Sequence, residues 1–109
     1  MARPDRVLSM LGLATKAGKI VSGETATENA VKNFEAYLVV IATDASDNTR
    51  KHFRDMCEYR DIPYREYGTK EELGHAIGRV YRSNLAITDE GFSRTVTERI
   101  DESGKGGCN

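Results

Sequence analysis

The 109-residue chain is poor in the residues that build disulfides and metal centres. Its two cysteines, Cys57 and Cys108, form no CxxC pair, and its two histidines, His52 and His75, have no metal-ligand spacing to either cysteine. Cys57 falls on the apolar stripe of an expected helix, where a lone cysteine usually acts as a small hydrophobe. We therefore expect a reduced protein with no metal and no cofactor.

Long apolar runs are also absent. No stretch approaches the ~18 apolar residues that cross a bilayer, and the first residues enter an amphipathic pattern without the apolar core of a secretory signal. These absences predict a cytoplasmic protein with no membrane partner. The length suits one α/β domain, which we place at residues 1–101, followed by a disordered glycine-rich tail at residues 102–109.

Catalytic motifs are missing as well. The chain has no GxSxG elbow, P-loop or HExxH, and the glycines at 74 and 78 fall within an expected helix, where a dinucleotide fingerprint does not lie. Asp44, Asp47 and Asp89 follow predicted strands, which leaves a small hydrolase or transferase open. Capping of the next helix accounts for these acids more simply, and Ser46 is another candidate cap. We expect no enzyme.

Helical and strand patterns alternate along the chain. Strands are predicted at 20–21, 37–42, 62–67 and 84–88, with helices before, between and after them. The apolar run at 37–42 implies a strand covered on both faces, and Pro63 indicates an edge strand or a strand start. Capping boxes are predicted at Thr25/Glu28 and Thr69/Glu72, and Phe34 and Val80 are expected to be buried. This order predicts a layered α/β sheet.

The charge is nearly balanced but unevenly distributed. A formal net charge of −1 argues against nucleic-acid binding by bulk charge. Residues 2–22 contain Arg3, Arg6, Lys16 and Lys19 against one acid, and residues 73–88 carry only Arg79 and Arg82 as formal charges. If these two acid-poor segments meet in space, the protein has one positive face.

Two glycine-marked junctions are the candidate binding features. A short strand stops at Gly23 and continues as a helix, which brings hydroxyls and free helix N–H donors to a spot that suits an anionic or hydrogen-bonding ligand. Gly74 is expected to allow close packing of a helix on the sheet. Gly78 is expected to end that helix and start a loop at 79–84.

The motifs at 11–14, 18–24, 43–49, 62–64, 73–78 and 88–92 occur in one order across the chain. In this respect the sequence resembles bacterial YlxQ-type proteins, which belong to the superfamily of ribosomal proteins that bind kink-turn RNA. Archaeal and eukaryotic large-subunit ribosomal proteins and snoRNP core proteins are relatives. The resemblance implies a three-layer α-β-α sandwich with a four-stranded mixed sheet. It also implies an RNA surface at the Gly23 junction, the first turns of the next helix and the loop after Gly78.

The resemblance also implies roles for individual residues. The polar pair that meets sheared G·A pairs in the family falls on Thr25 and Ala26, and the supporting lysine falls on Asn29, so two positions depart from the family pattern. We expect base, sugar or phosphate contacts from three groups. These are the junction and helix residues Ser22, Gly23, Glu24, Thr25 and Asn29; the cations Lys16, Lys19, Lys32, Arg79 and Arg82; and Val80, Tyr81 and Ser83 against an extruded nucleotide.

These observations favour a monomeric RNA-binding protein that recognises kink-turn-like RNA as a ribosome-associated or accessory ribosomal protein. A second hypothesis stays open. Because Ala26 cannot hydrogen-bond through its side chain and Asn29 lacks a charge, the same scaffold could serve as a protein–protein interaction module with weakened RNA binding.

Overall fold

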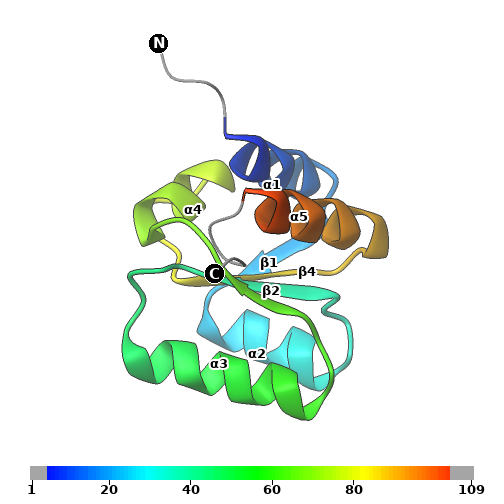
Figure 1. Ribbon diagram of the computed structural model, residues 1–109, viewed down its shortest axis with the longest axis vertical. Helices are drawn as coiled ribbons and strands as arrows, with labels where there is room; N and C mark the ends of the chain where they lie inside the picture. Colours follow the sequence, from blue (N-terminus) through cyan, green and yellow to red (C-terminus); the bar gives the residue numbers. More distant parts are fainter. Residues whose placement is uncertain (1–4, 104–109) are drawn as a thin grey trace.

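The computed structural model describes residues 5–103, within which helices and strands alternate in strict order (Figure 1). The helices are α1 (Arg6–Lys16), α2 (Glu24–Lys32), α3 (Asp47–Tyr59), α4 (Lys70–Ala76) and α5 (Glu90–Glu102). The strands are β1 (Ile20–Ser22), β2 (Leu38–Ile41), β3 (Tyr64–Glu66) and β4 (Asn84–Ile87). Each predicted strand is present, with its ends shifted by a residue or two.

The strands form one mixed sheet in the order β1-β4-β2-β3. β4 is antiparallel to both β1 and β2, whereas β3 is parallel to β2. Helices α1, α4 and α5 cover one face of the sheet, and α2 and α3 cover the other (Figure 1). The three-layer α-β-α sandwich with a four-stranded mixed sheet is therefore confirmed.

The core centres on the two inner strands, β2 and β4, whose residues are all buried. The apolar sequences of β2 and of residues 85–87 in β4 follow from this position, because helices cover both faces of the strands. Phe53 of α3 and Leu11 of α1 complete the core from opposite sides and are fully buried. The strand that follows Pro63 is the edge strand β3, as its proline predicted.

The helix caps confirm some of the predicted capping residues and correct others. Thr69 and Glu72 form the predicted capping box, and Asp89 caps α5 by accepting from the Phe92 N–H. Ser46 caps α3, so the expectation that Asp44 or Asp47 caps this helix was wrong. The Asp44 carboxylate accepts from the Lys70 N–H at 2.8 Å, and Asp47 is the first residue of α3 and pairs with Arg50. The Thr25/Glu28 box was wrong. The helix begins two residues earlier, after Gly23, which has no side chain to cap it.

Two apolar residues expected in the core are exposed. Phe34 is 68% exposed, because it lies just past the end of α2. Val80 is 80% exposed, since α4 ends at Ala76 and Gly78 takes a positive φ of 80° that turns the chain away. Both errors came from extending an apolar helical spacing beyond the true helix end.

The two ends of the chain are only partly described. Helix α5 includes Glu102, which the sequence placed in the tail, whereas residues 104–109 and Cys108 lie outside the described residues. Cys57 is buried as predicted, and burial raises the pKa of its thiol to about 11. Within residues 5–103, no helix combines the length and apolar character needed to cross a membrane.

Candidate nucleic-acid interface

The junction between β1 and α2 is built around Gly23. Its φ of 93° and ψ of 152° belong to a region that only glycine enters readily, and this conformation turns the chain from the strand into the helix. Gly23 is the N-cap, so no side chain accepts from the N–H groups of the first turn. Those donors lie beside the exposed side chains of Glu24 and Thr25 and can bind an external acceptor.

The loop between α4 and β4 is held by backbone hydrogen bonds. The Gly78 N–H donates to the His75 carbonyl at 3.2 Å and the Arg79 N–H donates to the Gly74 carbonyl at 2.7 Å, which together form a Schellman motif. Further along, the Arg82 N–H donates to the Lys70 carbonyl at 3.1 Å. The loop thus has a fixed path from the end of α4 to the start of β4.

Gly74 lets this loop lie against α4. A Cβ at Gly74 would approach the Val80 carbonyl oxygen to 2.6 Å and the Tyr81 Cα to 2.8 Å. The close approach is therefore to the loop, not to the sheet as the sequence had suggested. The side chains of Val80 and Tyr81 point outward and are 80% and 60% exposed. A rigid loop thus presents two apolar side chains to solvent.

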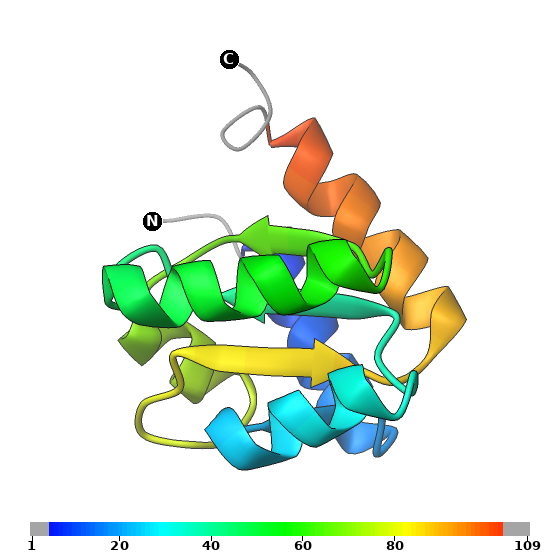
Figure 2. The ribbon, with the colours of Figure 1, turned by 90° about the horizontal axis from the view of Figure 1, so that it is seen from below.

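The junction and the loop are brought together by β1 and β4. Ser22 pairs with Leu85 across the strands, and the Arg82 Nε donates to the Ser22 Oγ at 2.9 Å. The same guanidinium donates through Nη1 to the Tyr81 carbonyl at 2.8 Å. In Figure 2 the loop before β4 lies beside the start of α2. The two acid-poor segments predicted from the sequence are therefore neighbours.

A cleft of about 300 Å³ opens at this contact. Its lining combines apolar side chains with two hydroxyl side chains and two arginines: Thr15, Ile20, Val21, Ser22, Ala26, Ile77, Arg79 and Arg82. Thr15, Ile20, Val21 and Ile77 were missed by the sequence analysis. No local motif marks them, because the cleft depends on how α1 and α4 pack beside β1. Ala26, noted only as a departure from the family pattern, lines the cleft with a short side chain.

The remaining predicted cations, all lysines, are not among the residues that line the cleft. Lys19 precedes β1, and its carbonyl accepts from the Thr88 N–H, so it lies roughly 10 Å along the strand from Ser22. Lys32 ends α2, about 12 Å along the helix from Glu24. Lys16, Lys19, Lys32 and Asn29 are all exposed. The predicted residues therefore form a central group at the cleft and a flanking group of lysines.

The fold and this site define a small α-β-α protein whose candidate site is an exposed edge between a helix start and an anchored loop. The model of the ribosomal protein L7Ae/L30e/S12e/Gadd45 family matches residues 5–97. The chain belongs to this family.

Relatives agree with this assignment. The chain is 39% identical over 92 residues to the RNA-binding protein YlxQ of Bacillus subtilis (strain 168), a match covering 84% of this chain and 92% of the relative. It is 34% identical over 97 residues to the RNA-binding protein YlxQ of Enterococcus faecium, covering 89% and 93%. The resemblance inferred from the sequence is thus confirmed.

Solved structures show the same fold. A protein of unknown function from Bacillus halodurans C superposes with a TM-score of 0.88 at 37% identity, covering 90% of this chain and 99% of the other. The Giardia lamblia 15.5kD RNA binding protein superposes with a TM-score of 0.75 at 24% identity, covering 94% and 90%. The family placement also supports the prediction that the chain is not an enzyme.

Proposed function

We propose that this chain is an RNA-binding protein that recognises kink-turn-like RNA and acts in the cytoplasm as a monomeric, ribosome-associated or accessory ribosomal protein. The observation that carries the proposal is the hydrogen bond between Arg82 and Ser22 at 2.9 Å, which joins the Gly23 junction to the α4–β4 loop. The names of the two YlxQ relatives support an RNA partner.

In this proposal the Gly23 junction contacts base and sugar edges. A residue without a side chain at Gly23 allows the backbone to approach the RNA closely. The first-turn N–H groups at Glu24 and Thr25 donate to RNA acceptors, and the Thr25 hydroxyl adds a contact that can donate or accept. The Ser22 hydroxyl, which accepts from Arg82, still has its own hydrogen to donate.

The cleft and loop are proposed to receive an unstacked nucleotide. Protein recognition of RNA commonly targets bases that are splayed out of the helix and stacked on protein side chains. Ile20, Val21 and Ile77 offer apolar walls, and Arg79 and Arg82 lie where a phosphate would approach. Val80, Tyr81 and Ser83 on the adjoining loop complete this proposed contact.

The flanking lysines are proposed to contact phosphates on either side of the bend. Lys16, Lys19 and Lys32 are exposed and carry no acid partner in the ion pairs of residues 5–103. With four to five phosphates neutralised, the logarithm of the binding constant should fall with the logarithm of salt at a slope of about −4, by the duplex rule of about −0.9 per phosphate.

The decisive experiment is a titration of a short kink-turn RNA with the purified protein at two salt concentrations. The control RNA has the G·A pairs replaced by Watson–Crick pairs. We expect the kink-turn to bind at least tenfold more tightly than the control, and both to weaken with salt. Equal, weak binding to both RNAs would overturn kink-turn recognition while leaving the family assignment intact.

Ala26 and Asn29 favour one alternative, a protein-interaction module on the same scaffold. Ala26 lacks the polar side chain, and Asn29 lacks the positive charge, that the family pattern has at these positions. The loop also exposes the apolar side chains of Val80 and Tyr81, which could contact a protein partner. A stoichiometric complex with a protein that survives charge reversal of Lys19 and Arg82 would support this alternative. Loss of RNA binding on the same reversals would support the RNA proposal.

A further inference from the structure

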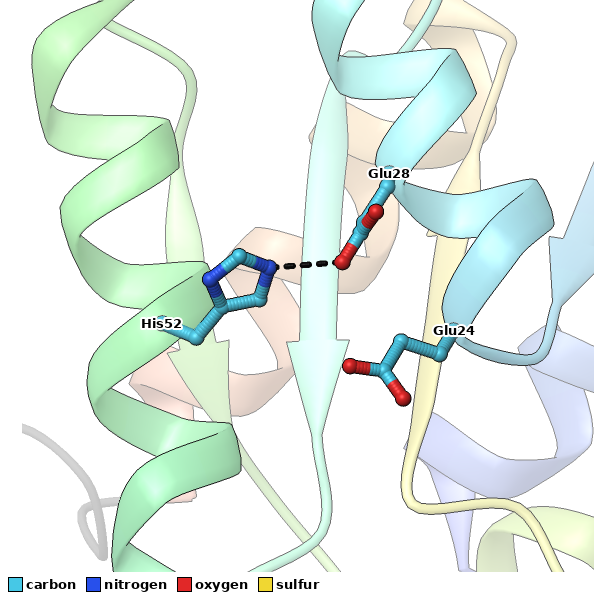
Figure 3. A group of neighbouring side chains, drawn as sticks. All are labelled: Glu24, Glu28 and His52. Atoms are coloured by element: carbon cyan, nitrogen blue, oxygen red, sulfur yellow. Dashed lines mark hydrogen bonds and ion pairs between the residues drawn. The ribbon is translucent and has the colours of Figure 1, made fainter.

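Three metal-ligating side chains converge between α2 and α3, on the face of the sheet opposite α1. Glu24 and Glu28 lie one turn apart on α2, and His52 faces them from α3 (Figure 3). Each offers a ligand atom, and these atoms all lie within 4.8 Å of one another. We name these three residues the α2–α3 cluster. Sequence spacing does not reveal this cluster, because His52 and Glu28 lie 24 positions apart on separate helices.

The α2–α3 cluster lies on two ordered helices that contact each other. The Glu28 Oε2 and the His52 Nε2 are already 2.7 Å apart, and the His52 ring packs edge-on against the buried ring of Phe53, with the ring centroids 5.1 Å apart. Glu28 is half-buried, whereas Glu24 at the first turn is exposed. Two donors are therefore fixed in place, and the third can rotate toward them.

The negative charge of the α2–α3 cluster is not balanced by a permanent cation. Among the ion pairs of residues 5–103, Glu24 has none and Glu28 has only His52, which is charged only when protonated. Two carboxylates four residues apart on a helix repel each other. Lys51, which directly precedes His52 on α3, is paired with Asp55 at 2.8 Å. A bound cation would remove this repulsion.

We propose that Glu24, Glu28 and His52 bind one divalent first-row transition-metal ion, such as Mn²⁺ or Zn²⁺. An imidazole nitrogen with carboxylate oxygens suits these ions, whereas Mg²⁺ and Ca²⁺ prefer oxygen ligands alone. Two donors at about 2.0–2.2 Å from one ion lie at most about 4.4 Å apart. A small rotation of the Glu24 side chain therefore completes the set, and the open positions of the ion remain for water or an external ligand.

The position of the α2–α3 cluster connects it to the candidate interface. Glu24 follows Gly23 directly, so its carboxylate would lie near the RNA in the function proposed above, and this consequence rests on that proposal. An ion on Glu24 and Glu28 would replace repulsion of phosphates by attraction and could accept a phosphate oxygen in an open position. We then expect the metal to tighten RNA binding. Metal binding itself does not require RNA.

The test is a titration of the untagged full-length protein with Mn²⁺, in the absence of RNA, followed by calorimetry and by paramagnetic broadening of amide NMR signals. We expect one saturable site, with broadening centred on the first two turns of α2 and on the middle of α3. Zn²⁺ should compete and reverse the broadening. Glu28→Gln and His52→Gln should each weaken binding at least tenfold, and both side chains are accessible enough for the variants to fold.

Glu58→Gln is the matched control, because Glu58 is an exposed carboxylate on the same helix as His52 and takes part in none of the ion pairs of residues 5–103. It should leave Mn²⁺ affinity within twofold of the native value. Equal affinity in the native protein and in Glu28→Gln, or broadening centred on another acidic segment, would overturn the site. If Mn²⁺ binds here but does not tighten a kink-turn RNA that the protein does bind, only the coupling to RNA is wrong.

Discussion

Phe34 and Asp61 are the residues other than glycine that have a positive φ within residues 5–103. Each follows a helix end at the position where glycine is usual. At Phe34, φ is 58°, and the N–H groups of Phe34 and Glu35 donate to the Val31 and Ala30 carbonyls. These are the two hydrogen bonds of a Schellman motif. Phe34, however, carries a Cβ, and the left-handed conformation costs such a residue roughly 1–2 kcal/mol.

Phe34→Gly should therefore raise the free energy of unfolding by about 1 kcal/mol, since the strain is relieved and an exposed ring loses few contacts. Urea denaturation followed by circular dichroism measures the change. Asn33→Gly is the matched control, because Asn33 has a φ of −90° and glycine there should lower stability. A gain in both variants, or in neither, would contradict this account of Phe34.

At the scale of elements, α4 and the loop after it behave as one unit. The Schellman motif ends the helix at Gly78. The backbone of Val80 and Tyr81 then packs closely against Gly74. A glycine inside a helix lowers stability by about 1 kcal/mol relative to alanine, but here it allows a contact that a Cβ would prevent.

Gly74→Ala should displace the loop and lower the free energy of unfolding by about 1–3 kcal/mol, because its Cβ would lie 2.6 Å from a backbone oxygen. It should also weaken RNA binding if the loop contacts RNA as proposed. Thermal unfolding and the RNA titration measure the two effects. Gly91→Ala in α5 is the control. Its nearest group is the Asp89 Oδ2 that caps α5, at 3.3 Å, so it should change stability by at most about 1 kcal/mol and leave RNA binding unchanged.

Helix α5 is joined to β3 by the ion pair between Arg65 and Asp101, whose Nε and Oδ1 are 2.9 Å apart. The hydrogen bond from Arg65 lowers the pKa of Asp101 in the folded protein. The stabilisation is therefore present above the unfolded-state pKa of about 4 and is lost as the pH falls below it. Because both side chains are well exposed, the pair contributes at most about 1 kcal/mol.

A double-mutant cycle with Arg65→Gln and Asp101→Asn should give a favourable coupling energy below about 1 kcal/mol at pH 7. The coupling should decline as Asp101 becomes protonated and be absent near pH 2, since a neutral carboxyl no longer attracts the guanidinium. A coupling that is unchanged between pH 7 and pH 2 would show that the contact stabilises by packing instead of by charge.

Much of the fold could be predicted because its signals are local. The apolar run around Val39 and Val40 predicted a strand covered on both faces, and Pro63 predicted an edge. The spacing of Thr25 and Glu28 predicted the wrong helix start, because residues with capping-box spacing can also lie inside a helix. The contact between Arg82 and Ser22 joins residues 60 positions apart, so no local pattern encodes its geometry.

At the scale of the whole molecule, the proposed interface has two parts. A central part distinguishes kink-turn RNA from other RNA, and a peripheral part adds affinity for any RNA. Lys19 and Lys32 are exposed and do not line the cleft, whereas Arg82 lines it and is hydrogen-bonded to Ser22 of β1 and to the Tyr81 carbonyl of the loop. Phosphate contacts position an RNA without reading its shape or sequence.

Lys19→Gln and Lys32→Gln should therefore each reduce the magnitude of the salt slope by about 0.9 while retaining the preference for the kink-turn over its control RNA. Arg82→Gln should reduce both the slope and the preference, because it also releases Ser22. Titrations at four salt concentrations would measure both quantities. Equal loss of preference in all three variants would mean that the division is wrong.

The strand order has a consequence for folding during synthesis of the chain. Within the described residues, the sole strand that pairs with β1 is β4, which comes more than 60 residues later and lies between β1 and β2. A nascent chain that has not yet reached Asn84 leaves Ile20–Ser22 without a strand to pair with, and the Gly23 turn is not yet held beside the α4–β4 loop. The surface proposed to bind RNA is thus completed only when β4 has been synthesised and inserted, and a chain that ends before Asn84 lacks it.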